Sequence, residues 1–357
     1  MVARALLGLL LLLAPPAWGA EGSRLAVICY HRFGPETAKD PYKISLKRLR
    51  AQLAWLRSSG WQGVGLTQVA AALAGQAGAL PDKGVMLTVD DGYKAGGLGA
   101  QAFEDAGYRG VYFVNPGSIG GRAFLSWDDL KGLEARGHEV ASHSATHPNL
   151  AKVPAGMRPA AWKAWLDGEL RGSRVEIERR LGHPVGALAW PFGAYNVPLI
   201  DAAKAAGYGQ LYTVSGGMNV GPGLDGLRLR RILLMGHPSL AAFQRHLRTL
   251  PVQAQVQGLE EGALFFRSQL PRAVRAQGDG LRAGLGGQPL EPLADGRWEL
   301  PAGLKDGFHY LVLDQGAGEG LRRTPLLFQV APDAWKACYR ALEQDSPVIK
   351  RDHADRP

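Results

Sequence analysis

A regular alternation of short apolar runs and amphipathic segments between residues 24 and 250 constrains the fold more than any other feature. Apolar runs of strand length, such as 25–30 and 85–89, are separated by segments whose apolar residues recur every three or four positions. The first such segment has Ser45 where a helix N-cap belongs and Gly60 where the helix would end. Its apolar face consists of Leu46, Leu49, Leu53 and Leu56. This alternation predicts an α/β fold of parallel strands covered by helices, open or closed, and several strands in such a stretch favour a (β/α) barrel.

The pattern of apolar and polar residues changes beyond Pro251. Short apolar or alternating runs there are separated by turn-rich pieces such as 277–280 and 294–296. This spacing predicts a small all-β sandwich domain over residues 256–342, to which we assign a glycan- or partner-binding accessory role. Residues 343–357 are charged and aperiodic, which predicts a flexible tail.

The first twenty residues have the pattern of a signal peptide. Arg4 precedes an almost purely Leu and Ala run over 5–14, and residues 17–20 offer small side chains for cleavage. The run is shorter than a membrane span, although an uncleaved anchor remains an alternative. We expect residues 1–20 to be removed and the mature chain, without a membrane span, to be periplasmic or secreted. Domain 21–250 would then carry the activity.

Charge and cysteine content narrow the classes of partner. The formal charge of +9, or +8 without Arg4, comes from scattered Lys and Arg residues, with no basic run interleaved with aromatics. Nucleic-acid binding is therefore not expected, whereas an acidic polymer or envelope surface is compatible with the charge. Cys29 and Cys338 are the two cysteines. They are expected to be buried free thiols or one long-range disulfide, and two cysteines alone do not make a metal site.

Two motifs that follow predicted strands carry metal-site chemistry. Asp90 and Asp91 end one strand before Gly92, and His143 and His147 follow another at a spacing of four residues. Since the carboxyl ends of parallel strands meet at one edge, these side chains would lie together, with both histidines facing one way if their segment forms a helical turn. Two histidines and one carboxylate can hold a divalent metal ion, leaving the other carboxylate as a base.

Two further segments end at the same edge of the predicted sheet. Residues 190–195, with the sequence Trp-Pro-Phe-Gly-Ala-Tyr, either form a plain turn or supply a fixed backbone N–H for an oxyanion, with aromatic side chains as pocket walls. The pair Tyr30-His31 places a histidine at the end of the first strand.

In order and spacing, the motifs at 88–93, 142–147 and 190–195 resemble the NodB-homology polysaccharide deacetylases, carbohydrate esterase family 4. The early Tyr30-His31 is similar to the poly-β-1,6-N-acetylglucosamine deacetylase branch. The resemblance covers about residues 24–250. It implies a deformed (β/α) barrel that removes N-acetyl groups with one divalent metal ion, usually zinc, although cobalt, nickel or manganese would suit the same ligands.

The resemblance also implies roles for individual residues. The metal ligands would be Asp91, His143 and His147. Asp90 would be the general base, and the Phe192 N–H would hold the oxyanion.

The general acid has two candidates. His31 is favoured by the branch, and the late His237 is the alternative. Where many members carry an arginine that restrains the base, this chain has Ala189, and Arg231 is expected to replace it, with Arg230 the other choice.

Candidate sugar contacts are Tyr93 and Tyr195, both of which could instead pack the pocket wall. The expected function is removal of N-acetyl groups from a polymer of N-acetylglucosamine, with β-1,6, β-1,4 or peptidoglycan linkages left open. The expected partners are the polysaccharide and exopolysaccharide export machinery. The alternatives are an O-acetyl esterase acting on xylan or another acetylated glycan, and a non-catalytic glycan-binding protein.

Overall fold

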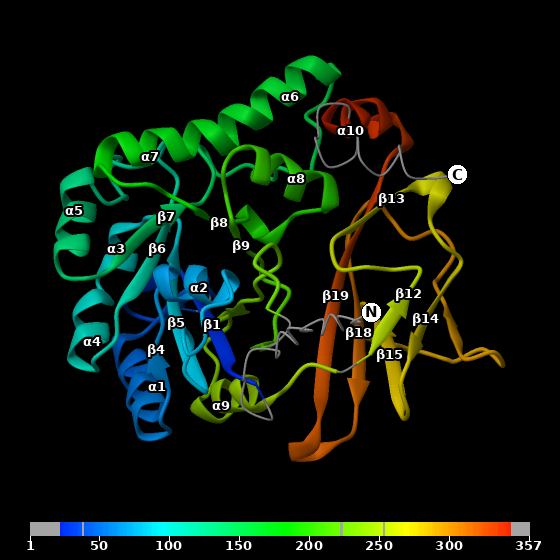
Figure 1. The fold of residues 1–357 in the computed structure, drawn as a ribbon, viewed down its shortest axis with the longest axis horizontal. Coiled ribbons are helices and arrows are strands. Elements are labelled where there is room, and N and C mark those ends of the chain that lie inside the picture. Colours follow the sequence, from blue (N-terminus) through cyan, green and yellow to red (C-terminus); the bar gives the residue numbers. More distant parts are fainter. Residues whose placement is uncertain (1–21, 38, 222–223, 253, 344–357) are drawn as a thin grey trace, which may run out of the picture.

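Parallel strands in a curled sheet form the core of the N-terminal part of the molecule, on the left in Figure 1. The computed structural model describes residues 22–37, 39–221, 224–252 and 254–343. The predicted signal peptide, and all of the predicted tail except Glu343, lie outside these residues. The sheet runs in the order β10-β1-β5-β6-β7-β8-β9. Its main strands are β1 (Arg24–Tyr30), β5 (Lys83–Asp90), β6 (Gly110–Val114), β7 (Glu139–Ser142), β8 (Ala187–Ala189) and β9 (Gln210–Tyr212).

The chain after β9 closes the circle of strands. Leu229 exchanges backbone hydrogen bonds with the β9 segment, and β11 (Ile232–Leu233) pairs in parallel with β1. Two short strands complete the sheet: β4 (Gln62–Gly63) beside β5, and β10 (Asn219–Val220) antiparallel to β1. The predicted deformed (β/α) barrel is therefore confirmed for this part of the chain.

Most helices cover the outside of the curled sheet (Figure 1), whereas Val69 and Ala72 of the second helix join the buried cluster on its inner side. The first begins where Ser45 accepts a hydrogen bond from the Arg48 N–H, as predicted, and ends just before Gly60, whose φ is 78°. The helices are α1 (Leu46–Ser58), α2 (Leu66–Leu73), α3 (Lys94–Gly97), α4 (Ala100–Asp105), α5 (Trp127–Ala135), α6 (Pro159–Asp167), α7 (Ser173–Leu181), α8 (Val197–Ala205) and α9 (Leu240–Arg248). Strands β2 (Arg32–Phe33) and β3 (Lys43–Ile44) pair with each other.

The period-2 alternation of the strands separates two apolar layers. Ile28 and Leu87 are among the residues that pack against the helices, whereas Val27 and Met86 belong to a second buried cluster inside the curled sheet. Side chains two residues further along on the inner face therefore point to the interior as well. This face leads directly to the site.

Residues beyond 254 form two further sheets, on the right in Figure 1. One contains β12 (Gln255–Gln257), β14 (Ala273–Gln277) and β17 (Arg297–Glu299), and the other β13 (Ala263–Phe266), β19 (Arg322–Ala331), β18 (Gly307–Gln315), β15 (Leu281–Leu285) and β16 (Gln288–Leu290). Helix α10 (Lys336–Glu343) follows. Leu327 and Tyr339 from this part join the large cluster around the barrel helices, so its separation as a β-sandwich domain stays a prediction.

Glu261 joins the barrel to the C-terminal strands. Its carboxylate accepts hydrogen bonds from the Tyr195 hydroxyl (2.7 Å), the Ser215 hydroxyl (2.7 Å), the Arg230 guanidinium (3.1 Å) and the Leu327 N–H (3.2 Å). Three of these donors belong to the barrel part of the chain. The segment just before β13 thus supplies a largely buried acceptor to residues in and beyond the third motif.

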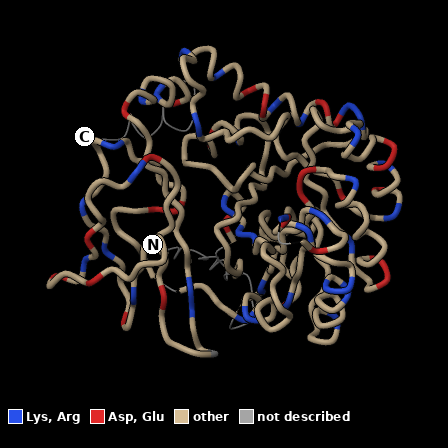
Figure 2. The backbone as a smooth tube through the Cα atoms, turned by 180° about the vertical axis from the view of Figure 1, so that it is seen from behind, with Lys and Arg blue, Asp and Glu red and all other residues tan. Residues whose placement is uncertain are grey.

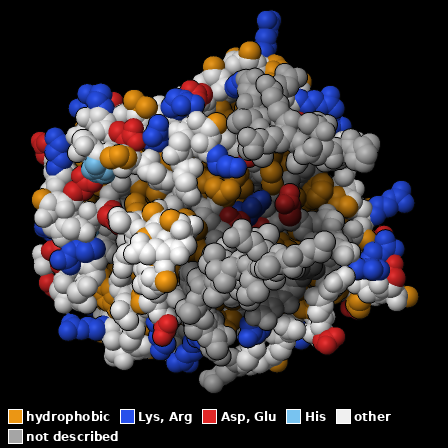
Figure 3. Space-filling view, in the orientation of Figure 1, with side chains coloured by type: hydrophobic (Ala, Val, Ile, Leu, Met, Phe, Trp, Pro, Cys, Tyr) orange, Lys and Arg blue, Asp and Glu red, His pale blue; other side chains and the backbone are white. Residues whose placement is uncertain are grey.

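The charged surface is mixed in sign. Figures 2 and 3 show Lys and Arg dispersed among Asp and Glu over the outer elements, in agreement with the scattered pattern of the sequence. Within the described ranges, no helix has the length and apolar character needed to cross a membrane. Cys29 and Cys338 are both buried free thiols.

Candidate metal centre and active site

Asp90 is the last residue of β5 and points into the barrel. It is 2% exposed, and its Oδ1 accepts a hydrogen bond of 2.7 Å from the Arg231 guanidinium. The Cys29 thiol donates to its Oδ2 at 3.4 Å. Arg231 is itself fully buried and also donates to the Thr213 carbonyl at 2.9 Å. The arginine predicted to replace the missing one at Ala189 thus reaches the carboxylate from the position just before β11, the strand that closes the barrel.

The ion pair keeps Asp90 ionised despite its burial. Burial alone would raise the pKa of this carboxyl, but Arg231, followed by His143 and His31, outweighs burial and holds the pKa below its usual value. An ionised carboxylate with one oxygen fixed by a guanidinium is a proton acceptor of defined orientation.

Asp91 and two histidines converge beside this carboxylate. The Oδ1 of Asp91 lies 3.5 Å from the Nε2 of His143 and 3.3 Å from the Nε2 of His147. These three ligand atoms lie within 4.8 Å of one another. His143 Nδ1 lies 2.8 Å from the Ala189 carbonyl oxygen, so that nitrogen carries the proton of the neutral ring and the Nε2 lone pair faces Asp91.

The loop that bears the histidines is not the helical turn that their spacing suggested. Ser144 and His147 have φ of 63° and 62°, in the left-handed region. The Ser144 hydroxyl accepts a hydrogen bond from the His147 N–H at 3.1 Å. The helical turn is therefore not how the two histidines come to face one way, although both rings reach Asp91. Each left-handed non-glycine residue costs about 1–2 kcal/mol, so contacts from elsewhere must hold the loop.

The cluster fits a divalent metal ion by distance and by charge. Ligands about 2.0–2.1 Å from a tetrahedral zinc ion lie about 3.3 Å apart, close to the two Asp91–histidine separations. Asp91 Oδ1 is buried and accepts no hydrogen bond in the described part of the chain. Burial would raise the pKa of Asp91 and lower that of His143. Both effects are outweighed: the two histidines hold the pKa of Asp91 low, and Asp90 and Asp91 raise the pKa of His143. The site thus favours positive charge beside Asp91.

A second set of potential ligand atoms, from Cys29, His31 and Asp90, also lies within 4.8 Å. It is a poor cation site for two reasons. The guanidinium of Arg231 is already paired with the Asp90 carboxylate. Burial raises the pKa of the Cys29 thiol well above its ordinary value, so the thiol stays protonated. The group instead shows that His31 lies beside Asp90.

The two candidate acids are placed differently. His31 follows β1, its Nδ1 is buried without a hydrogen-bond partner among the described residues, and its ring lies 4.9 Å from that of Tyr42. His237 lies in the loop before α9, where its Nε2 is 3.2 Å from the Thr37 carbonyl oxygen. His31 therefore shares the mouth of the barrel with Asp90, whereas His237 belongs to neither cluster of ligand atoms.

The third motif forms a tight turn after β8. Phe192 has a φ of 60°, and its ring is 65% exposed and lies 4.7 Å from that of His147, so the turn reaches the metal-site loop. Tyr195 is fully buried and its hydroxyl is bonded to Glu261. Tyr195 is therefore a wall residue and not a sugar contact, which corrects that prediction. Tyr93 is half-buried and stacks on Phe124 at 4.7 Å.

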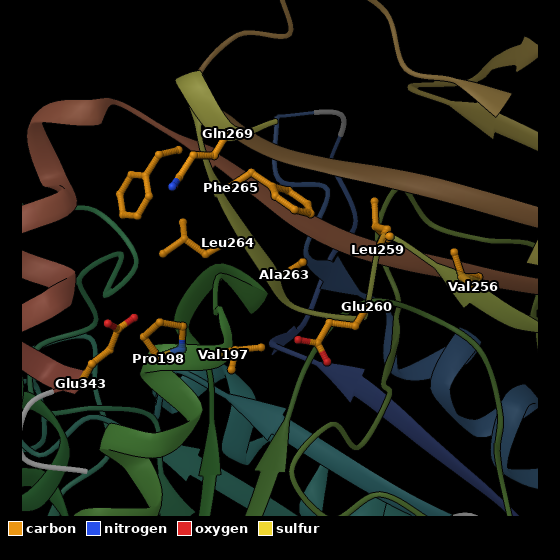
Figure 4. A pocket seen from close by; sticks show the side chains of 12 residues that line it. Val197, Pro198, Val256, Leu259, Glu260, Ala263, Leu264, Phe265, Gln269 and Glu343 are labelled. Carbon is orange, nitrogen blue, oxygen red and sulfur yellow. The ribbon is translucent and has the colours of Figure 1, made fainter. Parts of the chain in front are cut away.

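A groove of about 570 Å³ between α8 and β13 lies apart from these residues (Figure 4). It is lined by Val197 and Pro198 from α8, by β13, and by carboxylates such as Glu260 and Glu343. This lining holds none of the candidate catalytic or ligand residues, so the site is the barrel mouth and not the groove.

Sequence reasoning missed the contact between Cys29 and Asp90. The alternation of β1 could have found it, because Cys29 is two residues beyond Val27 on the inner face. It also missed Glu169, a buried carboxylate from the helix behind the second motif. No spacing in the sequence links that residue to the histidines.

Comparison with known proteins supports the resemblance carried by the three motifs. Residues 77–211 match a family model described as polysaccharide deacetylase. This segment contains Asp90, Asp91, His143, His147 and Phe192.

The poly-beta-1,6-N-acetyl-D-glucosamine N-deacetylase of Escherichia coli strain K12 is 25% identical over 276 residues, which are 67% of this chain and 40% of that protein. The chain therefore spans less than half the length of this curated relative.

Solved structures show the same barrel. IcaB from Ammonifex degensii is 26% identical with a TM-score of 0.52, covering 60% of this chain and 92% of that one. A de-N-acetylase from Aggregatibacter actinomycetemcomitans has a TM-score of 0.56 at 23% identity, covering 63% of this chain and all of that one, which is a likeness of fold.

Proposed function

We propose that this chain, whose residues 77–211 belong to the polysaccharide deacetylase family, hydrolyses N-acetyl groups on a polymer of N-acetylglucosamine outside the cytoplasm. One observation carries the proposal: an ionised Asp90, oriented by Arg231, lies next to the set Asp91, His143 and His147. A metal-dependent hydrolytic centre needs both a base and a metal site, and here they are adjacent.

The residues present would hold a divalent ion, which we propose to be zinc, through one carboxylate and two imidazoles. Such an ion would lower the pKa of a water ligand and polarise the acetyl carbonyl. Cobalt, nickel or manganese also suits these ligands. The metal bound in the native protein therefore depends on which ion is available where the exported protein folds.

The chain's own groups account for the proton transfers. Asp90 takes the proton from the attacking water through Oδ2, the oxygen 3.7 Å from His143 Nε2, while Oδ1 accepts from Arg231. The water oxygen bonds to the acetyl carbon, and the Phe192 backbone N–H is our candidate donor to the resulting oxyanion. His31 then gives a proton to the sugar nitrogen as the carbon–nitrogen bond breaks. The products are a free amine on the sugar and acetate.

The polymer substrate is supported by the relative named as acting on poly-beta-1,6-N-acetyl-D-glucosamine. The exposed ring of Phe192, with the half-buried Tyr93, offers apolar surface to a sugar ring at the barrel mouth. Export of the chain is supported by the signal-peptide pattern of residues 1–20. We further propose export machinery for the polymer as a partner, and an accessory role for residues 256–342.

Amine release from β-1,6- and β-1,4-linked N-acetylglucosamine oligomers tests the activity. The purified protein is assayed metal-stripped and after zinc, cobalt, nickel or manganese is restored, beside Asp90→Asn and the exposed control Asp128→Asn. We expect amine release to depend on the metal. The rate should fall by about 10²–10⁴-fold in Asp90→Asn and stay at the wild-type level in Asp128→Asn. Release of acetate from acetylated xylan but not from either oligomer series would instead show an O-acetyl esterase. No turnover on any substrate with metal bound would show a binding protein. N-terminal sequencing of the mature protein tests export.

A further inference from the structure

The helix behind the metal-site loop changes its winding in the middle. Helices α6 and α7 form one continuous rod in Figure 1, joined by a π-helical segment over Gly168–Gly172. A π-helical turn is wider than an α-helical turn and leaves carbonyl groups for partners outside the helix. Two carbonyls of this segment have such partners. The Glu169 carbonyl accepts from the Ala145 N–H at 3.0 Å, and the Leu170 carbonyl accepts from the Tyr208 hydroxyl at 2.9 Å.

The Glu169 side chain holds the same loop at a second point. Its carboxylate accepts from the Thr146 N–H at 2.9 Å and from the Thr146 hydroxyl at 2.6 Å, and the residue is 5% exposed. Thr146 directly precedes His147, and Ser144 and His147 on either side of this segment have left-handed backbone conformations. Glu169 therefore fixes the loop between the two histidines, where the backbone most needs outside support.

A second contact secures the residue before His143. The Tyr208 hydroxyl, whose proton goes to the Leu170 carbonyl, lies 2.8 Å from the Ser142 hydroxyl, and the Ser142 hydroxyl lies 2.8 Å from that of Ser173 at the start of α7. The π-helical segment and its neighbours thus hold the chain on both sides of His143, and the carboxylate of Glu169 is the charged member of this set.

We propose that Glu169 is a positioning residue for the metal site, acting through Thr146 to set the His147 ring against Asp91. This inference rests on the proposed metal-dependent function, because it concerns the same ligands. Residues that orient metal ligands commonly contribute 10–100-fold to metal affinity. Glu169 would do so without touching the metal or the substrate.

Metal affinity of matched variants tests the role. Zinc dissociation constants are measured by competition with a chromophoric chelator for the full chain and for Glu169→Ala, Glu169→Gln and Thr146→Val. Glu176→Gln on α7 is the control, since Glu176 bonds only Arg179 and Arg180 among the described residues. Circular dichroism and urea unfolding show which variants are folded.

We expect Glu169→Ala to weaken zinc binding by about 10–100-fold and Thr146→Val by less. Glu169→Gln should stay within about threefold of wild type, because its amide oxygen still accepts from the Thr146 N–H and its amide nitrogen donates to the Thr146 hydroxyl. The control should be unchanged. If Glu169→Ala does not fold, the same ordering is read from Thr146→Val against wild type.

Failure of the positioning role and failure of the proposed metal site give different results. Wild-type affinity in folded Glu169→Ala, or in Thr146→Val when Glu169→Ala does not fold, overturns the positioning role and leaves the metal site intact. Absence of zinc, cobalt, nickel and manganese binding by the wild type removes the metal site, and this inference with it. Weakened binding in Glu169→Gln equal to that in Glu169→Ala would overturn the hydrogen-bond explanation, since charge alone would then decide.

Discussion

Replacing Arg231 by methionine should destabilise the folded protein severely. The substitution removes the guanidinium that donates to Asp90 at 2.7 Å and to the Thr213 carbonyl at 2.9 Å, all of it at a fully buried position. Two unit charges about 4 Å apart attract by about 4 kcal/mol at an effective dielectric constant near 20. Breaking a buried pair by removing one partner costs about 3–5 kcal/mol, because the remaining charge stays buried. We therefore expect a loss of about 3–5 kcal/mol at pH 7.5.

The loss should depend on pH with a defined sign. In the wild type the folded-state pKa of Asp90 is depressed, so this carboxylate contributes stability above its unfolded pKa of about 3.9 and the contribution is lost as pH falls through the folded value. In Arg231→Met, burial acts without the guanidinium and raises the pKa of Asp90. The difference between variant and wild type should therefore shrink as pH falls from 7.5 to 5.

Urea unfolding of the metal-stripped proteins measures both effects, because a bound ion would partly replace the lost charge. The double variant Asp90→Asn with Arg231→Met leaves no uncompensated charge, and it should recover about half of the loss or more. A loss below about 1 kcal/mol in Arg231→Met, or a double variant as unstable as the single one, would show that the pair is not what holds this part of the barrel.

Three further outcomes are expected. In the amine-release assay, His31→Gln should lower kcat by about 10²-fold or more while His237→Gln stays within about threefold, and the reverse order would assign the acid to His237. Cys29→Ser should retain activity within about tenfold because the hydroxyl still donates to the base, whereas Cys29→Ala should lose more; equal losses would argue against the thiol as donor. The Arg48 hydrogen bond lowers the pKa of Glu36 to about 2, so its contribution of up to about 1 kcal/mol should be present above pH 4.5 and disappear as pH falls towards 2. In urea unfolding, Glu36→Gln should remove this part of the pH dependence, and a profile that keeps it would contradict the assignment.

The barrel and its inner face follow from patterns that are local in sequence. Period-2 alternation carries the inner face of β5 to Asp90, and the same rule for β1 leads to Cys29 and His31. Strand order then places β7, which the two ligand histidines follow, beside β6 and two strands from β5, since consecutive parallel strands neighbour one another. Short-range patterns and one topological rule therefore suffice for most of the candidate site.

The remaining features depend on contacts that no local pattern encodes. The left-handed backbone at Ser144 and His147 replaces the helical turn that the spacing suggested, because backbone hydrogen bonds to the side chains of Glu169 and Ser144 hold the loop. The motif leaves Tyr195 open between a sugar contact and pocket-wall packing, and the hydrogen bond from its hydroxyl to Glu261, 66 residues away, decides for the buried wall position. Burial and long-range pairing decided these positions.

The hydrogen bonds that Glu261 accepts from the barrel limit how the barrel and the C-terminal strands can be exchanged between proteins. A cut between the barrel and the C-terminal strands would leave the Tyr195 hydroxyl and the Arg230 guanidinium without their shared acceptor. A chimera that joins this barrel to foreign strands would have to bring an acid in register with those donors. The two halves of the chain are therefore expected to be inherited together, as one unit of exchange.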